Sequence, residues 1–123
     1  GYVDEAGIRA EIEKTWKEDG YLMDTHTAVA WNVYEAFKND LFGKTVVLST
    51  ASAYKFSSSV LDALGVSYEN EFDAIEKLKA KTGVPVPGGL ADILSKEIVH
   101  KNVIEKSDML SFVENTIKDG AKQ

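Results

Sequence analysis

The stretch LSTASAYKF, residues 48–56, places small and hydroxyl-bearing side chains directly after a short apolar run. Ser49 and Thr50 can donate or accept hydrogen bonds, and the small Ala51 leaves room for a ligand to come close. In open α/β sheets, ligands bind at the carboxyl ends of parallel strands, where each strand leads into a helix. The same hydroxyls can instead bond to neighbouring backbone inside a core. Position and composition leave these two interpretations equal.

A second polar cluster, Asp24, His26 and Thr27, lies at the predicted start of a helix. One interpretation makes His26 a general base that Asp24 orients. The other makes Asp24 the helix cap and His26 a hydrogen-bonding residue of the first turn. Capping alone accounts for the spacing, so we favour the second interpretation.

Other kinds of site lack the residues that they need. His26 and His100 are the only histidines and have no ligand partner at helical spacing, so we expect no metal site. The chain has no cysteine, which excludes disulfides, thiolate zinc sites and thiol nucleophiles. Twenty acidic residues against 14 basic ones give a net charge of −6, which argues against a nucleic-acid partner. Gly88 and Gly89 lack the Gly-Lys-Ser of a phosphate-binding loop, so we interpret them as an ordinary loop.

The length of 123 residues fits one domain. We treat residues 1–123 as a single segment, with a sub-boundary in the proline- and glycine-rich loop 83–89. No apolar run approaches the roughly 18 residues that a membrane span needs. The acidic N-terminus does not resemble a signal peptide. These absences predict a cytoplasmic protein without a membrane partner.

Apolar spacing predicts five to six helices. They cover residues 4–19, 26–38, 57–64 and 70–81, a short helix with Leu90, Ile93 and Leu94, and a final helix with Leu110, Val113 and Ile117. Helix 26–38 is apolar on most sides, which predicts burial from more than one direction.

Residues 45–50, within KTVVLST, form the one run typical of a buried strand. A lone strand cannot satisfy its own backbone groups, and no second run of equal quality exists. We therefore expect either a strand that pairs poorly or partner strands outside this chain. An open strand edge would also permit a homodimer.

Both polar stretches resemble threonine synthase. GYLMDTHTAVAW, residues 20–31, is similar to the Gly-Tyr…Asp/Glu-Pro-His-x-Ala-Val-Ala segment of that family. TASAYKF, residues 50–56, is similar to its Thr-Ala-His-Pro-Ala-Lys-Phe, and VLDALG at 60–65 to the following helix ending in Leu-Gly. The resemblance is close over residues 18–65, with matching spacing between the two blocks, and weak after about residue 70.

Three positions depart from the family pattern. Ser52 and Ala53 replace the common histidine and proline, and Thr25 replaces the usual proline after aspartate. Roles of the family's histidine at position 52 and of its prolines at positions 25 and 53 therefore do not transfer to this chain. The hydroxyl of Thr50 is unaffected.

The resemblance implies the C-terminal part of a longer enzyme. Threonine synthases use pyridoxal phosphate on a type II fold, a parallel sheet flanked by helices in two domains. They convert O-phosphohomoserine and water to threonine and phosphate. On this basis we expect an α/β fragment, mainly α-helical, whose principal strand at 45–50 joins that sheet in the full-length enzyme. Its partners would be the rest of the enzyme and the small substrate.

The resemblance also assigns one site residue. It implies that the Thr50 hydroxyl meets the pyridine nitrogen of the cofactor, and it leaves open whether Lys55 and His26 face the active site. The lysine that forms the Schiff base lies upstream in the family, so we expect no catalytic residue here. The isolated chain is expected to bind no cofactor and to be inactive.

Two alternatives stay open. The chain could be a self-contained helical interaction module with an acidic surface. It could also be part of a related pyridoxal-phosphate lyase that acts on another substrate.

Overall fold

The structure, a computed structural model, describes residues 1–93 and 95–120. The chain forms two compact units, an N-terminal unit of residues 1–93 and a C-terminal unit that begins at residue 94. The described residues form six α-helices and three 3₁₀ helices. Leu94, which we expected on the short helix, lies outside the described residues. The single segment and its sub-boundary at 83–89 stay predictions.

Five α-helices belong to the N-terminal unit. They are α1 (Glu5–Asp19), α2 (Thr25–Phe37), α3 (Ser57–Ala63), α4 (Glu71–Thr82) and α5 (Gly88–Ala91), with 3₁₀ helices at Lys38–Asp40 and Ala53–Phe56. Local chemistry sets their ends. The side chain of Asp4 accepts a hydrogen bond from the Gly7 amide at 2.8 Å and caps α1. Gly20 ends the helix at φ +66°, a conformation that glycine adopts without steric cost.

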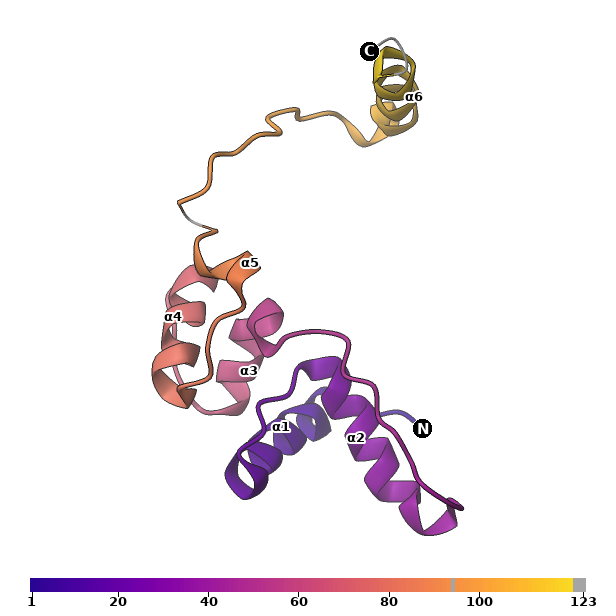
Figure 1. The fold of residues 1–123 in the computed structure, drawn as a ribbon, viewed down its shortest axis with the longest axis vertical. Coiled ribbons are helices and arrows are strands. Elements are labelled where there is room, and N and C mark those ends of the chain that lie inside the picture. Colours follow the sequence, from indigo (N-terminus) through magenta and orange to yellow (C-terminus); the bar gives the residue numbers. More distant parts are fainter. Residues whose placement is uncertain (94, 121–123) are drawn as a thin grey trace. The chain divides into compact units, whose positions relative to one another are not determined.

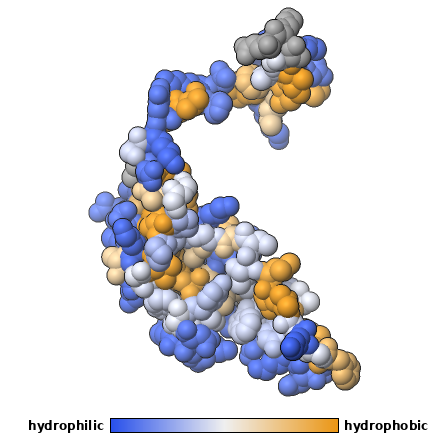
Figure 2. Space-filling model, viewed as in Figure 1, coloured by the Kyte–Doolittle hydropathy of each residue, from blue (hydrophilic) through white to orange (hydrophobic). Residues whose placement is uncertain are grey.

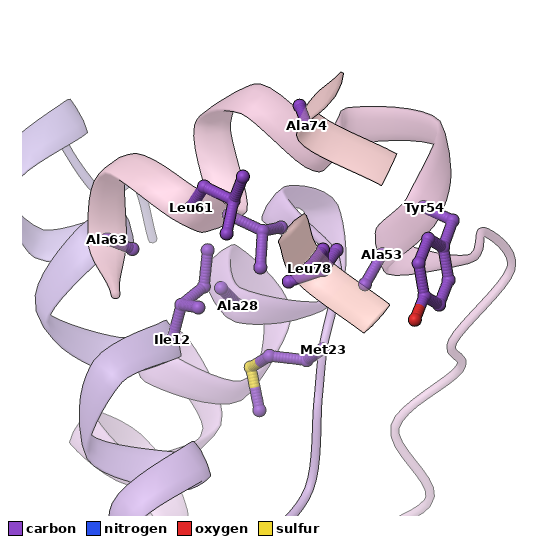
Figure 3. Packing of buried hydrophobic residues seen from close by; sticks show 10 residues of the cluster. Ile12, Met23, Ala28, Ala53, Tyr54, Leu61, Ala63, Ala74 and Leu78 are labelled. Carbon is purple, nitrogen blue, oxygen red and sulfur yellow. The ribbon is translucent and has the colours of Figure 1, made fainter. Parts of the chain in front are cut away.

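The core lies where α1, α2, α3 and α4 meet (Figure 3). Ile12, Ala28, Leu61 and Leu78, one from each helix, are at most 1% exposed. Each lies on the apolar face that the sequence predicts for its helix. Burial of apolar surface of this kind is the dominant favourable contribution to folding.

Two polar contacts tie segments together around this core. The Asn32 side-chain amide on α2 donates to the buried carboxylate of Glu11 on α1 at 2.8 Å. The Tyr54 hydroxyl donates to the Val84 carbonyl oxygen in the loop after α4. Each contact gives a buried polar group a partner, which avoids the cost of an unpaired one.

The predicted strand at 45–50 is wrong. Within the described residues the fold is helical, with no strand and no sheet, so the chain is not an α/β fragment. Residues 44–50 form an extended segment without regular secondary structure, which runs back along α2 (Figure 1). The β-branched run favours an extended backbone, but a strand also needs a partner for its ladder of hydrogen bonds, and no described segment supplies one. The homodimer that we expected through a strand edge stays a prediction.

Apolar side chains stay exposed along this segment and along α2. Phe42, Val46 and Leu48 expose 101%, 80% and 75% of their surfaces. Figure 2 shows hydrophobic surface where the segment passes α2. On α2 itself only Thr27 and Ala28 are buried, so the predicted burial of this helix from several directions is wrong for the chain by itself.

The C-terminal unit contains the 3₁₀ helix Lys106–Asp108 and α6 (Met109–Gly120). The apolar face of α6 carries Leu110, Val113 and Ile117, all exposed, and hydrophobic surface is visible there in Figure 2. No helix in residues 1–93 or 95–120 combines the length and the apolar character that crossing a membrane requires.

The buried Tyr54 makes the N-terminal unit sensitive to alkaline pH. Burial raises the pKa of Tyr54 above its ordinary value of 10.0, an effect that the hydrogen bond with Thr82 partly opposes. Because the folded-state pKa is raised, this stabilisation is complete below about pH 10 and is lost as the pH rises through the folded-state pKa.

We expect the melting temperature of the chain to fall more steeply above about pH 10 than that of Tyr54→Phe. Thermal melts at several pH values check this, with Tyr2→Phe as the control because Tyr2 is 92% exposed. Equal alkaline slopes in the wild type and Tyr54→Phe would contradict the prediction.

Candidate functional site

Asp24 is the N-cap of α2 and one of the most deeply buried polar residues of the chain. Its side chain is fully buried. The carboxylate accepts hydrogen bonds from the backbone amides of His26 at 2.9 Å and Thr27 at 3.4 Å. These amides belong to the first turn of a helix, which has no intrahelical partners for them, so capping pairs both groups. The predicted capping role of Asp24 is confirmed.

The cap extends into a chain of hydroxyls. The Thr27 hydroxyl bonds to the second carboxylate oxygen of Asp24 and lies 3.0 Å from the Ser49 hydroxyl. A carboxylate only accepts, so Thr27 gives its single hydroxyl proton to Asp24. The Ser49 hydroxyl must then donate to the Thr27 oxygen. We call this chain, Ser49 to Thr27 to Asp24, the hydroxyl relay.

The relay borders an apolar pocket of about 390 Å³ in the N-terminal unit. The pocket is lined by Thr15, Asp19, Tyr21, Met23, Thr27, Trp31, Val47 and Ser49. Val47 and Ser49 are two positions apart and both face it, as expected for an extended backbone whose side chains alternate. Thr50 is not among the residues that line this pocket.

The side chain of Thr50 is exposed. Within the described part of the chain its hydroxyl makes no hydrogen bond, whereas the neighbouring hydroxyls are occupied. Ser49 donates to Thr27, and the Ser52 oxygen caps the 3₁₀ helix η2 (Ala53–Phe56) by accepting from the Tyr54 amide at 3.2 Å. Thr50 is thus the exposed hydroxyl of this stretch that has no partner among the described residues, whereas Ser52 accepts one hydrogen bond and keeps its own hydroxyl proton.

His26 lies between the two polar stretches. Its ring packs against that of Phe56, with centroids 4.8 Å apart. Nδ1 is 3.2 Å from the Asp24 carboxylate and 3.3 Å from the Thr25 hydroxyl, and the contact with the carboxylate favours the neutral tautomer that carries the proton on Nδ1. Nε2 is then the acceptor nitrogen, on a side chain that is 69% exposed.

The other residues that the sequence singled out lie apart from this site. Lys55 is exposed on η2, and Gly88 and Gly89 begin the short α5. His100 is exposed in the C-terminal unit, outside any helix. No group of three or more acidic, histidine or cysteine side chains among the described residues is placed to hold a metal ion.

The hydroxyl relay was not predicted. The sequence identified Thr27 within one polar cluster and Ser49 within another, but nothing in their types or spacing pairs them. They are 22 residues apart and meet because the segment after α2 returns along that helix. The one signal available in the sequence was that both hydroxyls lie in stretches that resemble the same family, which suggests that the two stretches belong to one site.

Comparison with known protein families gives one finding. The family described as "Threonine synthase, C-terminal" matches residues 27–113, more than half of the chain. The matched range contains Thr27, Ser49 and Thr50 and begins just after Asp24 and His26. It also extends well beyond residue 65, where the motif resemblance weakens.

Removing the Asp24 carboxylate should destabilise the N-terminal unit more than removing the other aspartate cap. Asp24→Ala leaves two backbone amides and a buried hydroxyl without their partner, which we expect to cost about 2–3 kcal/mol of unfolding free energy. Asp4→Ala, the matched control, removes one exposed cap contact and should cost about 1 kcal/mol or less.

Urea unfolding followed by the fluorescence of Trp16 and Trp31, both in the N-terminal unit, measures the two values. A cost for Asp24→Ala that does not exceed that for Asp4→Ala would show that the relay contributes nothing to stability.

Proposed function

The chain belongs to the threonine synthase C-terminal family, and on that premise we propose that it is the C-terminal part of an enzyme that converts O-phosphohomoserine and water to threonine and phosphate. The family match over residues 27–113 carries this proposal. Within the matched range, the free hydroxyl of Thr50 is the group that fits a role in the reaction.

The cofactor implied by the family is pyridoxal phosphate, which serves as an electron sink for a substrate carbanion. Thr50 fits one contact to it, because an exposed hydroxyl without a protein partner can donate to an unprotonated pyridine nitrogen. A hydroxyl carries no negative charge, so it does not favour the protonated ring as a carboxylate would. We propose that Thr50 binds and orients the ring in this way.

The remaining cofactor contacts would come from elsewhere in the enzyme. The chain has no match to the family's cofactor-anchoring lysine or to its phosphate-binding loop, so we propose that the isolated chain is inactive. Its exposed apolar residues support a larger protein around it. Phe42, Val46 and Leu48 lie on one segment and would be covered by the rest of the enzyme.

Substitution of Thr50 in the full-length enzyme tests this role. Thr50→Val keeps the shape of the side chain and removes the hydroxyl. We expect turnover to fall about 10- to 100-fold, as for loss of one hydrogen bond that matters in the transition state, with a shift of the cofactor absorption band. Thr50→Ser keeps the hydroxyl and should retain most of the turnover.

Thr116→Val is the matched control, since the Thr116 hydroxyl donates to the Phe112 carbonyl oxygen within α6. It should leave both the absorption band and turnover unchanged. Unchanged turnover and spectrum in Thr50→Val would show that Thr50 does not contact the ring.

The mass of the native polypeptide separates the enzyme from an interaction module. We expect peptides of LSTASAYKF, residues 48–56, to come from a cellular protein several times larger than 13.5 kDa. A native species near 13.5 kDa would lack the cofactor-anchoring lysine and would favour a self-contained helical module. Measuring phosphate release from several phosphorylated amino acids would distinguish threonine synthase from a related lyase.

A further inference from the structure

We propose that Asp24, Thr27 and Ser49 are positioning residues, which hold the segment before Thr50 so that its hydroxyl points at the ligand. This inference rests on the proposed role of Thr50 and extends it to three residues outside the cofactor contact. The hydroxyl relay carries it, because the relay joins the helix α2 to the residue next to Thr50.

The relay begins at the Asp24 carboxylate, whose position is fixed by its surroundings. The Asp24 carboxylate is fully buried and is held by two backbone amides of the first turn of α2. A buried carboxylate is retained only where its hydrogen bonds are satisfied, so its position is tied to the helix. Ala28, in the same turn, is completely buried in the core, which fixes that turn against α1.

Thr27 transmits this position to the extended segment. Its hydroxyl proton goes to Asp24, and its oxygen receives the proton of Ser49. Each hydroxyl has only one proton, so the direction of both bonds is determined by the carboxylate. The Ser49 oxygen is therefore held at 3.0 Å from Thr27, on the inner side of the segment.

No other hydrogen bond among the described residues ties residues 44–50 to the rest of the unit. Among the neighbouring side chains, Val46 and Leu48 are 80% and 75% exposed, and Val47 is half-buried against the pocket. Ser49 is thus the hydrogen-bonded anchor nearest to Thr50. Because side chains alternate along an extended backbone, holding the Ser49 side chain against Thr27 directs the Thr50 side chain to the other side of the segment.

The direction of the relay also has a chemical consequence. The Ser49 proton is committed to Thr27, so Ser49 cannot compete with Thr50 as the donor to a ring nitrogen. If the relay lost its carboxylate or its central hydroxyl, the Ser49 hydroxyl would be free to rotate and the choice of donor would be lost. The relay therefore removes Ser49 as a competing donor as well as placing Thr50.

Thr27→Val tests the inference, because it keeps the shape of the side chain and removes the central hydroxyl. The first readout is the backbone ¹⁵N order parameter of residues 47–50 in the 123-residue chain. We expect it to fall from a value near 0.85, typical of rigid backbone, to below about 0.6 in Thr27→Val and in Ser49→Ala. Thr27→Ser restores the hydroxyl and should keep the wild-type value.

The second readout is the cofactor absorption band and kcat of the full-length enzyme. Thr27→Val should shift both in the same direction as Thr50→Val, with a smaller effect, and Thr27→Ser should restore them. The double variant Thr27→Val/Thr50→Val should be no worse than Thr50→Val, because the relay acts through Thr50. Thr116→Val again serves as the control and should change none of these quantities.

The outcomes separate this inference from the proposed function. Unchanged order parameters, band and kcat in Thr27→Val, together with an effect of Thr50→Val, would overturn the relay and leave the role of Thr50 intact. That result would mean that other contacts in the full-length enzyme hold the segment. An unchanged absorption band and kcat in Thr50→Val would overturn the role of Thr50 itself, and with it the positioning role of the relay.

Discussion

The buried carboxylate of Asp24, at the N-terminus of α2, must find a hydrogen-bond donor for each of its oxygens, and the local structure around Thr50 depends on how it does so. Backbone amides of the first helical turn satisfy one oxygen, and the Thr27 hydroxyl satisfies the other. Because the Thr27 hydroxyl donates its single proton to the carboxylate, its oxygen accepts a hydrogen bond from the Ser49 hydroxyl. One capping interaction thereby connects a helix to a segment that has no regular structure of its own.

This connection matters because the chain as it stands is only partly packed. A core of small and medium-sized side chains joins the first four helices of the N-terminal unit. Outside it, Phe42, Val46 and Leu48 remain exposed along one segment, as do the apolar residues of α6. Apolar surface of this extent usually marks contact with another body of protein. Membership of the threonine synthase C-terminal family supplies a reason for it, since the rest of such an enzyme would cover these residues.

The helices were predictable because their signals are local. Asp4 and Gly20 bracket α1, and Asn70 and Gly83 bracket α4, each acting on backbone groups a few residues away. The strand prediction failed for the opposite reason. The β-branched residues of 45–50 favour an extended backbone, but a strand also needs a partner strand, which local sequence does not specify, and the described residues contain none.

The sequence by itself determined the bounds of the first four helices to within one residue, the capping role of Asp24 and, through a family motif, the role proposed for Thr50. The short helix was predicted less well, because α5 ends at Ala91, before the expected Ile93. The helix bounds and the cap depend on residues within about one helical turn of each other, and the role of Thr50 depends on a recognisable family motif. Only the tertiary structure decided that Thr27 meets Ser49, 22 residues away, and that the Ser49 hydroxyl is hydrogen-bonded whereas the Thr50 hydroxyl has no partner among the described residues. Such contacts follow from how α1 to α4 pack around their shared core, which steers the segment after α2 back along that helix.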